Sequence, residues 1–148
     1  MIKLGGSCGC GVCAFEATAA PRARFICHCT ICQAFTGKAF SDVAVLPAKV
    51  VRFVNAQQIE YRTYRSPPNI NRGHCRACGG AVAETAGFGP AKIVFVPAQN
   101  FKSAELLPPP RMHVFYEHRK ADVADGLPKH EGYWRSQAAI ISLLFRSL

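Results

Sequence analysis

The sequence has no long apolar run, no long basic run and no low-complexity linker. Its longest apolar stretch, residues 138–145, is interrupted by Ser142 and is far shorter than the ~20 residues of a membrane span. Residues 1–4 lead directly into Gly5-Gly6 without the apolar segment of a secretory signal. We therefore expect no membrane partner and a cytoplasmic location.

Charge is unbalanced but dispersed. The chain has 18 Lys and Arg against 9 Asp and Glu, a formal net charge of +9, and no basic run exceeds two residues, as at Arg119-Lys120. A nucleic-acid-binding arm would need a cluster, so nucleic acid is not the expected partner. An evenly solvated basic surface and a pocket for a small anion both fit this charge.

Turn residues divide the 148 residues into short segments, which predicts a single, mainly β domain with few short helices. Strands are expected over 12–18, 43–46, 50–54, 59–64, 81–85, 92–96 and 112–116. A short helical turn is expected over 30–35, and a helix over 133–145, where apolar residues recur three or four apart. We expect residues 1–132 to form the domain and 133–148 to form a helical tail, not a second domain.

Eight cysteines fall in three clusters. In a reducing compartment, so many thiols favour metal binding or catalysis over disulfides. A disulfide framework, or one four-cysteine site with the other thiols buried, remain the alternatives. The clusters are Cys8-Gly9-Cys10 with Cys13 three residues on, Cys27-His28-Cys29-Thr30-Ile31-Cys32, and Cys75-Arg76-Ala77-Cys78.

The spacing of the third cluster predicts half of a structural zinc site. Cys75 and Cys78 flank a tight turn in which Gly79 can adopt a positive φ. Zinc requires four tetrahedral ligands. Cys8 and Cys10 are the natural second pair, because residues two apart on a strand share one face. A zinc ion on these four residues would pin the N-terminal segment to the middle of the domain.

The central cluster predicts a second, catalytic zinc. Cys27, Cys29 and Cys32 supply three thiolates, and three protein ligands with an open fourth position are typical of catalytic zinc. His28 could be the fourth ligand, but in an extended segment it would face the other way. Cys13 follows Val12 in an apolar strand and is interpreted as a packed core thiol.

Four segments, in order and spacing, resemble the glutathione-dependent formaldehyde-activating enzyme family, which includes the centromere protein V-like proteins. The similarity runs over about residues 5–100, with weaker echoes at His113-Val114-Phe115 and Asp125-Gly126-Leu127-Pro128. The segments are Gly6-Ser7-Cys8-Gly9-Cys10-Gly11, Cys27-His28-Cys29-Thr30-Ile31-Cys32 leading to Thr36-Gly37, Tyr64-Arg65-Ser66, and Gly73-His74-Cys75-Arg76-Ala77-Cys78-Gly79.

The resemblance implies a β-tent fold of packed β-sheets with two zinc ions per chain, one structural and one catalytic, on the same two sets of cysteines. It implies a carbon–sulfur lyase that adds glutathione, as co-substrate, to formaldehyde to form S-hydroxymethylglutathione. The chain departs from the family at Ala34 and Phe35, where members often carry a basic or polar residue, and in its ending after Leu127-Pro128. Both departures bear on the substrate pocket that the resemblance implies, and not on the metal sites.

Glutathione carries two carboxylates, so basic residues near the clusters are candidates for binding it. Two chemical routes are open: glutathione could bind the metal as a thiolate, or the metal could polarise the aldehyde oxygen. His74 is interpreted as a proton shuttle or as a hydrogen-bond partner of a zinc thiolate, and His113 as a site residue or a core histidine. The carboxylate-binding candidates are Arg24, Lys38, Arg65 and Arg72.

A different class of function is the alternative: a non-catalytic, zinc-stabilised module that binds protein or nucleic acid. The open central cluster favours the enzyme, because binding modules commonly fill every zinc position. No stretch alternates aromatic residues with clustered Arg and Lys, as a nucleic-acid platform would. We expect a thiol and an aldehyde as partners and leave a homodimer open.

Overall fold

The computed structural model describes residues 3–64 and 70–147, and its fold is mainly β, as predicted. One sheet contains β1 (Leu4–Ser7), β2 (Ala14–Ala17) and β5 (Val51–Phe53), in the order β1-β2-β5. The other contains β3 (Ala23–Cys27), β4 (Ser41–Pro47), β6 (Ile59–Arg62), β7 (Ile70–Cys75), β8 (Ala81–Ala86), β9 (Ile93–Pro97) and β10 (His113–Val114). Its order is β10-β3-β4-β9-β8-β7-β6, and only the β10–β3 pairing among the described strands is parallel.

Two α-helices accompany the sheets. The helix α1 (Thr30–Thr36) begins after Cys29, whose sulfur caps it, and ends at Gly37 with a left-handed φ of 68°. The helix α2 is longer (Tyr133–Arg146). Within the described ranges, neither helix has the length and apolar character needed to cross a membrane. Short 3-10 turns complete the chain: η1 (Ala48–Val50), η2 (Ala56–Gln58), η3 (Gly89–Ala91), η4 (Ala98–Asn100), η5 (Ala104–Leu106) and η6 (Tyr116–His118).

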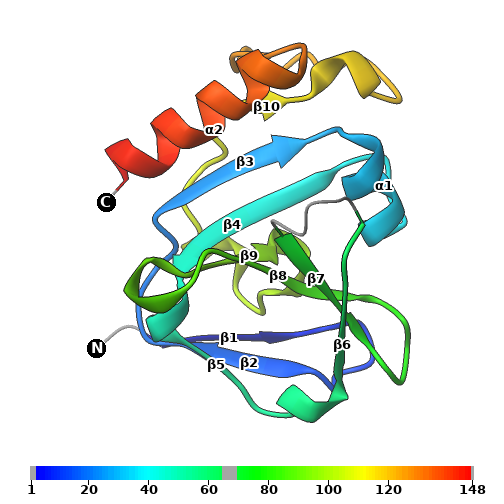
Figure 1. Ribbon diagram of the computed structural model, residues 1–148, viewed down its shortest axis with the longest axis vertical. Helices are drawn as coiled ribbons and strands as arrows, with labels where there is room; N and C mark the ends of the chain where they lie inside the picture. The colour runs from blue at the N-terminus through cyan, green and yellow to red at the C-terminus, as the bar shows by residue number, and fades with distance from the viewer. Residues whose placement is uncertain (1–2, 65–69, 148) are drawn as a thin grey trace.

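The two sheets and α2 form three layers, with the seven-stranded sheet in the middle (Figure 1). One face of this sheet packs against the three-stranded sheet through a first core that includes Phe15, Leu46 and Val82. The opposite face packs against α2 through a second core that includes Phe25 and Leu143. The C-terminal helix is thus docked on its own domain.

Strand β4 shows why the middle sheet has so apolar a sequence. Ala44 and Leu46 lie in the first core, whereas Val43 and Val45 lie in the second. A strand covered on both faces has no solvent side on which polar residues are favoured. Residues 43–46 therefore read as a continuous apolar run instead of an alternation.

Every predicted strand overlaps an observed one, and both predicted helices are present. The strands that were not predicted are β1, β3 and β7. Glycines interrupt two of them, Gly5-Gly6 in β1 and Gly73 in β7. Because glycine is depleted in strands, these segments lack the pattern that identifies one from sequence.

Two local expectations were wrong. Cys8 and Cys10 do not lie on a strand: β1 ends just before Cys8, and both residues belong to a turn in which the Gly11 N–H donates to the Cys8 carbonyl at 3.1 Å. The strand expected over 112–116 is only the two-residue β10, because Phe115 takes a left-handed backbone conformation (φ 52°) and ends it.

Strand β1 approaches η4 so closely that a side chain is excluded at Gly6. A Cβ there would overlap the Asn100 carbonyl oxygen and lie 2.6 Å from Phe15 Cζ. The amide of Asn100 is itself fixed by donating to the carbonyls of Ala81 and Val82 at 3.0 and 3.1 Å. A side chain at Gly6 would therefore meet the backbone and a buried ring, and neither can move aside freely.

We predict that Gly6→Ala destabilises the fold by about 3 kcal/mol, since overpacking of a rigid site is costly. The measurement is urea unfolding with zinc present. Gly5→Ala is the matched control: its nearest non-adjacent atom, the Phe15 carbonyl oxygen, would lie at 3.8 Å, an ordinary contact. Equal unfolding midpoints for the two variants would contradict this account of β1.

Candidate metal centres and the adjoining cavity

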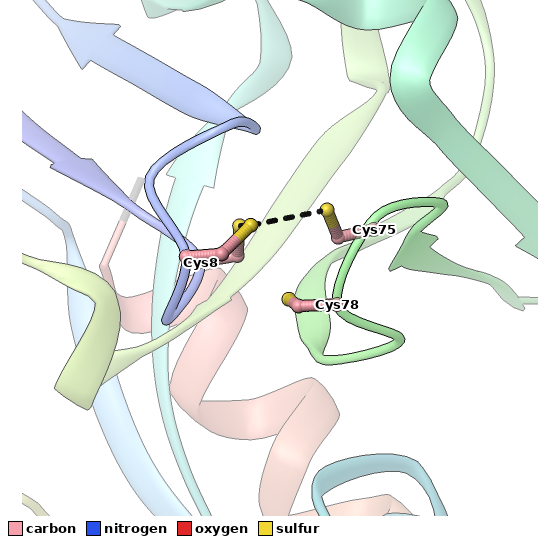
Figure 2. Close-up of side chains that lie close together, drawn as sticks. Cys8, Cys75 and Cys78 are labelled. Carbon is pink, nitrogen blue, oxygen red and sulfur yellow. Dashed lines mark hydrogen bonds between the residues drawn. The ribbon is translucent and has the colours of Figure 1, made fainter.

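The first cluster, defined as Cys8, Cys10, Cys75 and Cys78, joins two turns. Cys8 and Cys10 lie in the turn after β1, Cys75 ends β7, and Cys78 lies in the turn toward β8. The Cys10 sulfur is 3.6 Å from that of Cys8 and 3.7 Å from that of Cys75, and all four sulfurs lie within 4.8 Å of one another. Figure 2 shows Cys8 facing Cys75 and Cys78 across the gap between the turns.

These spacings fit one tetrahedral metal ion. Zn–S bonds of ~2.3 Å place the sulfurs of a tetrahedron about 3.8 Å apart, and all eight cysteines are free of disulfides. Backbone amides donate to two of these thiols: the Cys13 nitrogen lies 3.5 Å from the Cys8 sulfur and the Gly80 nitrogen 3.4 Å from that of Cys78. The first cluster can therefore hold a metal with all four positions filled by protein.

The turn after β7 also prepares Cys75 for metal binding. Burial raises the pKa of its thiol, but hydrogen bonds from the backbone amides of Cys78 and Ala77 and from the thiols of Cys13 and Cys8 together lower it more, so that the pKa falls to about 6. Gly79 has the expected positive φ, 74°, and its N–H donates to the Cys75 carbonyl at 2.8 Å. A thiol that ionises readily binds a metal with less loss of free energy.

The second cluster, Cys27, Cys29 and Cys32, is built where β3 ends and α1 begins. Cys27 is the last residue of β3, Cys29 caps α1, and Cys32 lies in its first turn. The Cys29 sulfur accepts a hydrogen bond from the Cys32 backbone N–H at 3.3 Å and lies 3.4 Å from the Cys27 sulfur. Hydrogen bonds from the thiols of Cys27 and Cys32 lower the pKa of Cys29 to about 3.

His28 does not join its two neighbouring cysteines. It is 1% exposed, and its Nε2 lies 2.8 Å from Nδ1 of His113. The extended backbone turns it away, as expected. Among the described residues, the second cluster contains only its three cysteines as metal-compatible ligands. It can therefore hold a metal while leaving one tetrahedral position for another molecule.

His113 is held at both ring nitrogens, which favours the core-histidine interpretation. Its Nδ1 faces His28, and its Nε2 lies 2.7 Å from the Asp125 carboxylate. Hydrogen bonds from Lys129 and His113 hold the pKa of Asp125 well below its usual range. This chain of contacts ties the 125–129 segment to the strand that ends in the second cluster.

His74 supports the first cluster indirectly. Its Nδ1 lies 3.1 Å from the Gly79 carbonyl oxygen, so Nδ1 carries the proton, and Nε2 then accepts from the Tyr64 hydroxyl at 2.5 Å. The expected hydrogen bond to a metal-binding sulfur is not the one observed. His74 also packs edge-on against Phe35 of α1, with ring centroids 5.1 Å apart.

A cavity of about 480 Å³ adjoins the second cluster, between the middle sheet and α2. The three cysteines of the second cluster line it, with aliphatic and aromatic residues from the sheet and from α2. In the described part of the chain, no residue of the first cluster lines it. The two clusters thus differ both in ligand number and in access to a ligand-sized space.

Arg72 and Glu84 form a buried ion pair on this wall. They lie opposite each other on β7 and β8, Arg72 Nε is 2.9 Å from Glu84 Oε2, and their side chains are 9% and 5% exposed. Burial raises the pKa of Glu84 to about 7. Sequence reasoning missed Glu84. The signal that could have found it is an acidic residue in the middle of an otherwise apolar strand.

Of the four predicted carboxylate-binding residues, Arg72 alone among those described lines the cavity. Arg24 is engaged elsewhere: its Nε and Nη2 each lie 2.8 Å from an oxygen of Asp42. Lys38 is exposed just beyond the end of α1. Arg65 lies outside the described residues.

Comparison with known proteins agrees with this geometry. Residues 3–118 match the family described as "Glutathione-dependent formaldehyde-activating enzyme". No curated protein matches the chain. A crystal structure of a Rhodobacter sphaeroides protein is similar in fold, with a TM-score of 0.53 and 19% identity over 66% of this chain and 87% of that one. The family match spans well over half of the sequence, including both clusters, and the chain belongs to the glutathione-dependent formaldehyde-activating enzyme family.

Proposed function

We propose that this protein is a zinc-dependent carbon–sulfur lyase that joins the thiol of glutathione to an aldehyde such as formaldehyde, or releases the two from their adduct. The observation that carries the proposal is the location of the three-sulfur cluster on the wall of a cavity. A metal ligated by three protein groups and open to a substrate space is the arrangement of a catalytic zinc site. The first cluster, with four sulfurs, would hold a structural zinc.

Cys27, Cys29 and Cys32 would hold the catalytic zinc, and their spacing already matches such a role. A bound zinc would supply a position where a substrate thiol ionises or an aldehyde oxygen is polarised. Around it, Cys29 is the readiest of the three thiols to ionise, because the other two donate hydrogen bonds to it. The end of β3 and the first turn of α1 bring these three sulfurs within 4.8 Å of one another.

Glu84 is suited to hold the proton that the reaction moves. Forming the adduct releases a proton from the thiol and adds one to the aldehyde oxygen. A carboxyl on the cavity wall with a pKa of about 7 can accept and return a proton near neutral pH. Arg72 orients this carboxyl from the neighbouring strand.

The first test counts zinc. We predict two zinc ions per chain in the wild type and one in the Cys27→Ser/Cys29→Ser/Cys32→Ser variant, measured by elemental mass spectrometry together with circular dichroism. The variant stays folded because the first cluster is intact and lies apart from the cavity. Cys13→Ser is the matched control: Cys13 is 0% exposed and its thiol contacts Cys75 of the first cluster, not the second cluster, so this variant should keep the second ion.

One zinc ion in both the wild type and the triple variant would leave the second cluster without a metal and remove the basis of the proposal. Loss of folding in the triple variant, with Cys13→Ser still folded, would make the second cluster structural. That outcome would favour a zinc-stabilised binding module over an enzyme.

The second test measures the reaction. We predict that the wild type accelerates exchange between formaldehyde, glutathione and their adduct, as followed by exchange NMR against the uncatalysed rate. Cys29→Ser should lower the protein-dependent rate about 100-fold, because loss of metal-dependent stabilisation of a few kcal/mol has that effect. Cys13→Ser provides the control, with a rate close to that of the wild type. A rate unaffected by Cys29→Ser would show that the second cluster does not carry the activity.

A further inference from the structure

The cavity is polar at one end and apolar at the other. The Arg72–Glu84 pair lies at the sulfur end, where the positive charge of Arg72 acts on Cys29. Two residues away along the same strands, Ile70 and Ala86 form the next cross-strand pair on the same face of the sheet. Two residues of strand correspond to about 6.7 Å. The wall therefore changes from charged to fully apolar over roughly one residue pair on one sheet face.

The helix α2 closes the apolar end. It runs along β3, with its C-terminal end toward the start of that strand and its N-terminal end toward the α1 side (Figure 1). Ile140 and Leu144 line the cavity and pack against the second core together with Ala86 and Ile93. The space beyond the ion pair is thus bounded by aliphatic side chains on the sheet side and the helix side.

Glutathione does not fit that apolar end. Its two carboxylates and one ammonium would need partners, and an unpaired buried charge is costly. The arginine on the wall, Arg72, is already paired with Glu84. The wall residues that are exposed and polar, Thr30, Glu117 and His118, mark the open side beside the second cluster. The charged peptide therefore belongs at this open side.

Formaldehyde does not fill the space either. A cavity of about 480 Å³ is within the range of roughly 300–1,000 Å³ in which proteins bury a drug-sized ligand. A one-carbon aldehyde would occupy only the position next to the sulfurs. The apolar end would then contribute nothing to binding the substrate.

We infer that the aldehyde taken by this site carries a linear apolar chain, which lies between Ala86, Ile93 and α2 while glutathione stays at the open side. This inference rests on the proposed lyase function. In the reaction the thiol sulfur forms a bond to the carbonyl carbon, the carbonyl π pair moves to the oxygen, and that oxygen takes up the proton lost by the thiol. No oxidant or reductant is consumed.

The test varies the aldehyde at constant glutathione on the zinc-loaded protein. We expect kcat/KM to rise from formaldehyde through butanal and hexanal to octanal, by about threefold for each methylene that is buried. A profile that is flat, or that falls from formaldehyde onward while formaldehyde itself is turned over, overturns the inference and leaves the proposed function standing. A site that prefers octanethiol with formaldehyde over glutathione with octanal would place the chain on the thiol and also overturn it.

A matched pair of variants tests the location. Ala86→Leu narrows the apolar end and should lower the octanal-to-formaldehyde ratio of kcat/KM by about tenfold, as expected for the loss of good fit in an apolar pocket. Ala138→Leu makes the same change on the exposed side of α2, outside the cavity wall, and should leave the ratio unchanged. Equal ratios in both variants would place the chain elsewhere and overturn the assignment.

Binding of an unreactive adduct analogue separates this inference from the proposed function. By calorimetry, S-octylglutathione should bind the zinc-loaded protein at least about 100-fold more tightly than S-methylglutathione, and Ala86→Leu should reduce that difference. Tighter binding of the octyl compound without any turnover would support the apolar subsite while contradicting the lyase. Equal binding of the two thioethers would overturn the inference whatever the activity.

Discussion

The convergence of Cys8 and Cys10 with Cys75 and Cys78 holds the turn after β1 against the turn after β7. Residues 65 apart in sequence bring their sulfurs to 3.7 Å. As thiolates at that spacing these groups would repel one another, and a shared cation would offset that repulsion. The cluster joins the turn of the smaller sheet to strand β7. Because Arg72 lies on that strand, three residues before Cys75, the same contact also helps to position the cavity wall.

The two faces of the middle sheet pack against different elements. The first core covers one face with side chains from the smaller sheet. On the other face, one helix covers the strands, and α2 leaves a cavity beside the second cluster. An alternation within single strands produces this division: in β4, Ala44 and Leu46 lie in the first core, and Val43 and Val45 lie in the second.

Sequence reasoning identified both clusters because metal binding needs a fixed number of ligands at close spacing, and that requirement is visible in the chain. It also identified strands that are apolar on both faces and the helix α2. It placed Cys8 and Cys10 on a strand, because it could not see that the turn after β1, and not strand alternation, brings their sulfurs together. It also missed Glu84, since a buried ion pair depends on cross-strand register, which sequence alone does not give.

The Arg72–Glu84 pair is better explained by the charge of the second cluster than by stability. A buried ion pair seldom stabilises a fold more than apolar residues of the same shape. A divalent ion on three thiolates, however, would carry a net charge of about minus one, next to a wall that is otherwise largely apolar. Arg72 acts on Cys29 with the opposite charge, and Glu84, with its pKa raised to about 7, can be neutral or charged near neutral pH. Under the proposed function, Arg72 would offset part of the negative charge of a metal-loaded second cluster. The charged parts of a substrate would then stay at the open side, and the space under α2 would take an uncharged chain.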